Sequence, residues 1–175
     1  PEVVALELDE VRLKGLLSDS RPASGGPVFV RAIRYFQERI GKKTGVMPGS
    51  EMLRAYEVAA DNELEVALID QDIRITVQNL RDVSFWEKLK AGAGLVYGLA
   101  ISSEKFPTDV PDEELINQLL YEMEFKFPEM YKVLVTDRNR HMEESLKMLE
   151  KEREGDIVAF VGAAHRKYLA EELSD

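Results

Sequence analysis

Three short apolar segments, at residues 3–8, 65–70 and 156–161, constrain the fold of this chain more than any other feature. Each is rich in β-branched and aliphatic residues and carries apolar side chains on both of its faces. Such strands are typical of a parallel sheet, in which helices cover both sides. Longer stretches with helical spacing separate the three segments. The pattern therefore predicts an α/β fold, a helix-rich single domain over residues 1–175 with a small, mainly parallel sheet.

Helix boundaries are indicated by polar caps, prolines and glycines between the expected strands. Ser50 and Asp72 are suitable caps for the helices that follow them. Pro128 is expected to open a long helix, which Gly155 ends. The other expected helices cover residues 9–17, 28–41, 84–102 and 112–127.

The composition excludes several classes of protein. A formal net charge of −10 argues against nucleic acid and anionic membrane as partners, because both would repel the chain. Without cysteine, the chain has neither disulfides nor thiolate metal sites. There is no run of about 18 apolar residues, so no membrane contact is expected from this chain itself. Because the first residue is Pro1, we expect a soluble domain excised from a longer protein, either cytoplasmic or membrane-associated through further C-terminal segments.

Polar residues follow each expected strand at the point where it ends. Glu7 and Asp9 end the first strand, Asp70 ends the second, and the third leads through Gly162 to His165. The carboxyl ends of parallel strands meet at one edge of the sheet, where ligands bind in open α/β folds. Glycine allows a tight turn there, and the helix that follows can turn its N–H groups toward an anion at the same edge. The sequence therefore predicts a site of carboxylates and a histidine at this edge.

Two charged residues interrupt apolar helical stripes. Arg138 lies on the stripe of the long helix that also holds Met142 and Leu146, and Glu57 lies in an alanine-rich helix. A buried arginine needs an anionic partner, and the strand-end carboxylates are suitable ones. Each of these features also has a structural interpretation. The acids can cap helices, Arg138 can reach the surface along its stem, and His141 can pair with Asp137 on the surface.

The order of three sequence blocks resembles the TraB/PrgY family, the pheromone-shutdown group related to the Tiki proteins. The first block, "PEVVALELDEVRLKGLL", is similar to the family's strand with an "ELD..R" element. The second, "GVMPGSEMLRAYEVAADNELEVALIDQDIRIT", is similar to its "PG.EM..A" and "LIDRDI..T" elements and is the most specific. The third joins "LVTDRNRHM" to a GxxH motif. The matching residues are Glu7, Asp9, Arg12, Pro48, Gly49, Glu51, Met52, Ala55, Asp70, Asp72, Thr76, Arg138, Met142, Gly162 and His165.

The chain also departs from the family pattern. The family carries a second GxxH motif before the first strand, and we expect that motif to precede Pro1. Gln71 and Asn79 stand where arginine is usual or frequent, Asp137 where glutamate is usual, and Asn139 where aspartate is usual. Family members often carry membrane helices after this domain, so the parent protein is expected to have them.

The resemblance implies two alternative functions. The first is a metal-dependent hydrolase of signalling peptides, with a divalent ion of the Mn or Co type. The second is a non-catalytic module that sequesters a short peptide. With one GxxH absent, this chain is expected to bind metal weakly or not at all, to be inactive as a peptidase, and to form a homodimer through an uncovered sheet edge. The implied roles are metal ligands at His165 and Glu7, a ligand or base at Glu57 or Asp70, an oxyanion contact at Arg138, and binding residues at Asp70, Asp72 and Gly162.

Overall fold

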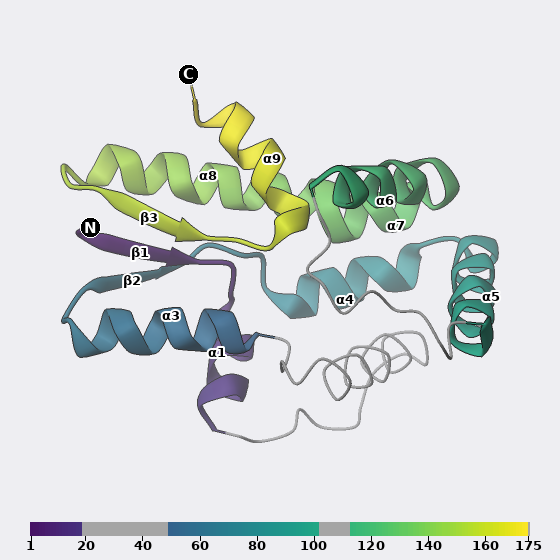
Figure 1. The fold of residues 1–175 in the computed structure, drawn as a ribbon, viewed down its shortest axis with the longest axis horizontal. Helices are drawn as coiled ribbons and strands as arrows, with labels where there is room; N and C mark the ends of the chain where they lie inside the picture. Colours follow the sequence, from purple (N-terminus) through teal and green to yellow (C-terminus); the bar gives the residue numbers. More distant parts are fainter. Residues whose placement is uncertain (19–48, 102–112, 175) are drawn as a thin grey trace.

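The computed structural model describes residues 1–18, 49–101 and 113–174 (Figure 1). The expected helix over residues 28–41 lies outside these ranges. Each of the expected helices within them is present, and the three expected strands form one sheet. The α/β fold predicted from the alternation of apolar segments and helical stretches is confirmed.

The sheet is parallel throughout and has the order β2-β1-β3. Its strands are β1 (Val3–Leu6), β2 (Glu65–Leu68) and β3 (Ile157–Phe160). Val4 of β1 is aligned with Val66 of β2 and Val158 of β3. Each strand is shorter than the segment predicted for it, and the Glu7 amide still donates to the Phe160 carbonyl at the end of β3.

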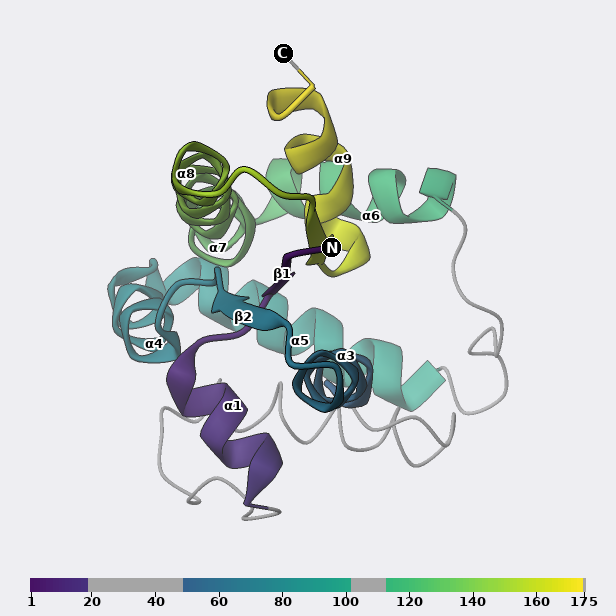
Figure 2. The ribbon, with the colours of Figure 1, turned by 90° about the vertical axis from the view of Figure 1, so that its left-hand side faces the viewer.

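Helices cover the two faces of the sheet (Figure 2). Helix α3 (Ser50–Asp61) lies on one face, and α8 (Asp137–Glu152) and α9 (Ala163–Glu172) lie on the other. The core on the α3 side contains Val4, Leu6, Leu8, Met52, Ala55 and Ala59. The core on the α8 side contains Ala5, Ile69, Met142, Leu146 and Leu169. β1 is central and fully buried, so it fixes the position of Glu7, the residue that follows it.

The remaining helices lie beyond the carboxyl edge of the sheet or next to it (Figure 1). They are α1 (Glu10–Leu17), α4 (Ile73–Asp82), α5 (Phe85–Ile101), α6 (Glu113–Lys126) and the short α7 (Pro128–Tyr131). None of the helices in the described ranges is long and apolar enough to cross a bilayer.

The long helix expected from Pro128 onward is interrupted by one wider turn. The segment Lys132–Thr136 is π-helical and joins α7 to α8. Single π turns inside helices occur frequently at functional sites. This one ends two residues before Arg138, so it sets the rotation at which α8 presents that residue to the sheet.

Of the two helix caps predicted from the sequence, Asp72 is observed and Ser50 is not. Asp72 caps α4 by accepting a hydrogen bond of 2.8 Å from the Arg74 amide, as expected. Ser50 is not a cap, because α3 begins with it and the cap position is Gly49. Gly49 has a φ of 85°, a conformation that glycine adopts without steric cost.

Candidate functional site

Four elements bring the candidate residues together at the carboxyl edge of the sheet. Glu7 follows β1 directly, Asp70 follows β2 after Ile69, and Gly162 begins the turn from β3 into α9. Arg138 enters from the first turn of α8. The clustering predicted from strand ends is therefore observed, although the side chains differ in what they contact.

Arg138 joins two of the strand ends. Its Nε donates to both carboxylate oxygens of Asp70 at 3.0 and 3.2 Å, and its Nη2 donates to Asp70 at 2.6 Å. Nη2 also donates to Oε1 of Glu7, and Nη1 contacts the Leu134 carbonyl at 3.4 Å. Only 16% of the side chain is exposed, so the guanidinium is paired inside the protein and does not reach the surface. Such paired burial is the arrangement in which losing one partner is costly.

Asp70 is held by two arginines. Its side chain is fully buried, and it accepts hydrogen bonds from Arg138, from Nη2 of Arg12 and from the Gln71 amide at 2.7 Å. Arg12 also bonds Asp9 at 2.6 Å, and Asp9 caps α1 through the Val11 amide. The "ELD..R" element therefore has a structural explanation, since its aspartate and arginine tie α1 to the end of β2.

Glu7 is the carboxylate that lies next to both Gly162 and His165. Its Oε2 accepts a hydrogen bond from the Gly162 amide, and its Oε1 faces Arg138 and His165. A Cβ on residue 162 would lie 3.0 Å from Oε2 of Glu7. The φ of Gly162 is −64°, which any residue can adopt. The reason predicted for this glycine, a tight turn, is therefore wrong. A side chain at residue 162 would instead require the Glu7 carboxylate to move by a few tenths of an ångström.

His165 is buried and oriented by Asn139. The residue is 3% exposed, and its Nδ1 lies 2.6 Å from Oδ1 of Asn139. With the Asn139 amide oriented in this way, its Oδ1 accepts the hydrogen bond, so Nδ1 carries the proton and Nε2 keeps a lone pair. Nε2 lies 3.4 Å from Oε1 of Glu7. Two electron-rich atoms therefore face each other across a short gap.

Burial keeps this imidazole neutral. It lowers the pKa of His165 to about 4; the Glu7 charge opposes the shift, and the charges of Arg138 and Arg12 add to it. At neutral pH, Nε2 is consequently available as a ligand or a base. Asn139 is the site residue that sequence reasoning missed. The sequence marked it only as a departure from the family pattern, and its place beside Arg138 on a helix gives no indication that it faces a histidine in α9.

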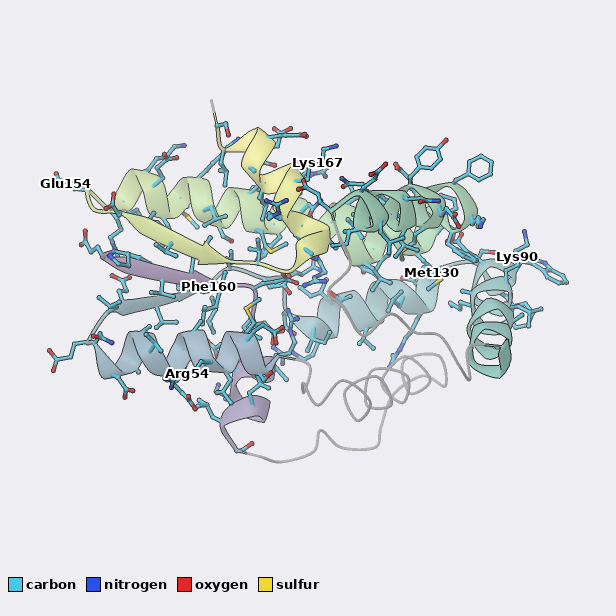
Figure 3. The ribbon with its side chains drawn as sticks, viewed as in Figure 1. Arg54, Lys90, Met130, Glu154, Phe160 and Lys167 are labelled. Carbon is cyan, nitrogen blue, oxygen red and sulfur yellow. The ribbon has the colours of Figure 1, made fainter. Side chains whose placement is uncertain are left out.

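Two expected site residues lie elsewhere. The expectation that Glu57 is buried in an apolar helix is wrong: its side chain is 49% exposed and accepts a hydrogen bond of 3.2 Å from Arg54. Figure 3 shows Arg54 on the side of α3 turned away from the sheet. Asp72 is a helix cap, and hydrogen bonds from Arg74 lower its pKa to about 2. On α8, Asp137 pairs with Lys132 at 2.6 Å.

Nε2 of His165 and the carboxylate of Glu7 can be compared with the ligands that a divalent metal ion requires. When a histidine binds a metal, its other ring nitrogen usually donates a hydrogen bond to a second protein group, which orients the ring. In His165, Nδ1 makes such a bond to Asn139, and Nε2 faces the carboxylate of Glu7. Ligand atoms each about 2.1 Å from one ion can be separated by roughly the distance found between Nε2 and Oε1. His165 and Glu7 therefore fit as two ligands. In the ranges that the structure describes, no three side chains of His, Cys, Asp or Glu are grouped to hold an ion.

The sequence matches one protein-family model and several known proteins. The family model described as the TraB/PrgY/gumN family matches residues 1–167. An uncharacterized protein, MJ1365, of Methanocaldococcus jannaschii is 33% identical over 185 residues, covering 94% of this chain and 45% of its own length. A TraB domain-containing protein of Mus musculus is 25% identical and covers 94% of this chain and 54% of its own length.

The human TraB domain-containing protein is 25% identical over 146 residues, covering 72% of this chain and 38% of its own length. The chain thus spans about half the length, or less, of these curated relatives. No solved structure matches the chain significantly.

Proposed function

Because the chain belongs to the TraB/PrgY/gumN family, we propose that its carboxyl sheet edge is the active site of a metal-dependent hydrolase that acts on peptides. The observation that carries the proposal is the pair formed by His165 and Glu7. A neutral, buried imidazole presents the lone pair of Nε2 to a carboxylate oxygen 3.4 Å away. Neither atom donates a proton to the other, so a cation at this position would relieve their repulsion.

In this proposal, His165 and Glu7 hold the ion. A divalent ion bound there would supply a nucleophilic water and polarise a carbonyl group. Asn139 is a positioning residue, because it fixes the ring of His165 and the nitrogen that carries the proton.

Arg138 and Asp70 have different roles. The side chain of Asp70 is fully buried under two arginines, so it cannot reach a substrate and is assigned to structure. Arg138 holds Glu7 in place. Its contacts with Asp70, Glu7 and Leu134 leave one N–H of Nη1 for a developing oxyanion.

A second candidate function is peptide binding without catalysis. The observation that favours it is that both oxygens of Glu7 already accept hydrogen bonds, from Arg138 and from the Gly162 amide. A carboxylate engaged in this way competes poorly for a cation. The same edge would then hold the charged end of a short peptide.

Calorimetric titration with Mn²⁺ and Co²⁺ tests the metal site directly. We expect His165→Ala to abolish binding and Asn139→Ala to weaken it about 10–100-fold, as loss of an orienting partner does. Glu144→Gln, in an exposed position of α8, is the matched control and should bind as the wild type does. Circular dichroism of each variant checks that the fold is kept.

Peptide turnover separates the two functions. Hydrolysis of a peptide mixture by the wild type with metal, lost in His165→Ala, supports the hydrolase and contradicts the expectation from the sequence that this chain is inactive as a peptidase. Peptide binding with no turnover and no dependence on metal supports the second function instead. Metal binding that is unchanged in His165→Ala would contradict the ligand assignment.

A further inference from the structure

Strand β3 is an edge strand of the sheet formed by the described residues. In the part of the chain that the structure describes, β3 pairs with β1 alone. Its carbonyls at Asp156 and Phe160 accept hydrogen bonds from Val3 and Glu7, so alternate residues face β1. The backbone groups of Ile157 and Ala159 therefore point to the outer edge. An open row of N–H and C=O groups is a template for pairing with another strand.

The same strand exposes apolar side chains on the α3 face. Val158 and Phe160 are aligned with Val4 and Leu6, which α3 covers. On β3 the side chains at these aligned positions are exposed, Val158 by 40% and Phe160 by 43%. Figure 3 shows Phe160 beside β3. The short strand "IVAF" has no lysine, proline or bulge, the features by which open edges are usually protected.

Charges of opposite sign flank the strand at its two ends. Glu154 and Asp156 precede it and are exposed, whereas Lys167 follows it on the exposed side of α9, where the neighbouring Arg166 pairs with Glu113 of α6. Figure 3 shows Glu154 beyond the start of β3 and Lys167 on the helix after its end. A strand that is acidic at one end and basic at the other is complementary to itself only when two copies run antiparallel. A two-fold axis generates that arrangement.

We propose that the outer edge of β3 binds a second copy of this chain. The two β3 strands pair antiparallel across a two-fold axis near Ala159, which gives a continuous six-stranded sheet. Val158 and Phe160 of both copies then cover each other, and the acidic end of each strand faces the basic end of its partner. The interface involves none of the contacts that hold Glu7, Arg138 and His165, so it is independent of the proposed catalytic function.

Analytical ultracentrifugation over a wide range of protein concentration tests the dimer. We expect a concentration-dependent dimer for the wild type and a monomer for Ala159→Pro. Proline removes an outward N–H without disturbing the inward groups that bond β1. Ala159→Ser keeps the N–H and should dimerise as the wild type does. Val158→Lys changes only an exposed side chain and should also give a monomer, so the test does not depend on the proline variant folding.

Charge reversal tests the antiparallel orientation. Glu154→Lys and Lys167→Glu should each weaken the dimer about tenfold, because two attractive contacts become repulsive. The double variant should restore the wild-type affinity. Glu10→Lys makes the same charge change on α1, far from the edge, and should leave the affinity unchanged. A wild type that stays monomeric, or a double variant as weak as the single ones, would overturn the proposal.

Discussion

Helices α3 and α8 cover opposite faces of one sheet, and each carries a charged residue that the sequence predicted to be buried. In α8, Arg138 is 16% exposed and touches the ends of two strands. In α3, Glu57 is 49% exposed and pairs with Arg54 one turn away. The buried residues of α3 are Met52, Ala55 and Ala59, and residue 57 lies off their stripe. The comparison teaches that position on the stripe, and not apolar sequence neighbours, decides whether a charge is buried.

Arg138→Leu should show the largest effect. It leaves the carboxylates of Glu7 and Asp70 buried beside each other without their shared cation, and should lower the free energy of unfolding by about 3 kcal/mol. Urea denaturation at neutral pH measures this loss. A change within about 0.5 kcal/mol, the range of surface substitutions, would show that Arg138 is as solvated as Glu57.

Acidification should lower the free energy of unfolding through His165, by somewhat less than Arg138→Leu does. The pKa of His165 is lowered to about 4, so between that pH and its ordinary value of 6.5 only the unfolded chain binds the proton. Stability therefore falls as pH decreases through this window. Between about pH 7 and pH 5, the contribution of His165 to the free energy of unfolding should fall by about 2 kcal/mol.

His165→Gln is the control for this measurement, because it removes the titrating group. Denaturant unfolding of both proteins at the two pH values gives the difference. If the wild type and His165→Gln lose the same stability on acidification, His165 is not the buried, neutral group at the sheet edge that the structure describes.

Glu57→Ala should have the smallest effect. The pair with Arg54 is exposed, and such pairs within a helix contribute about 0.3–0.5 kcal/mol. Thermal and urea unfolding should therefore show almost no change. A loss as large as that of Arg138→Leu would mean that α3 buries Glu57 and that the contrast between the two helices is wrong.

Apolar segments and helical periodicity were enough to predict the sheet, the order of the helices and the grouping of polar residues at the strand ends. Strands with two apolar faces need covering on both sides, so segments 3–8, 65–70 and 156–161 specify a parallel sheet. Parallel strands end at one edge, which fixes Glu7, Asp70 and the turn at Gly162 as neighbours. The stripe of α8 required an anionic partner for Arg138, and the structure supplies two.

The contacts that those residues make with one another depend on how the helices pack. Asn139 and His165 lie in different helices, and their hydrogen bond depends on the angle at which α8 and α9 meet. The π-helical turn at 132–136 sets the rotation of α8, and no local sequence pattern marks it. Contacts between segments distant in the chain depend on packing geometry, whereas periodicity reports only which face of an element is buried. For this reason the sequence places Glu7 and His165 at the same edge, and only the fold shows that Asn139 contacts the His165 ring.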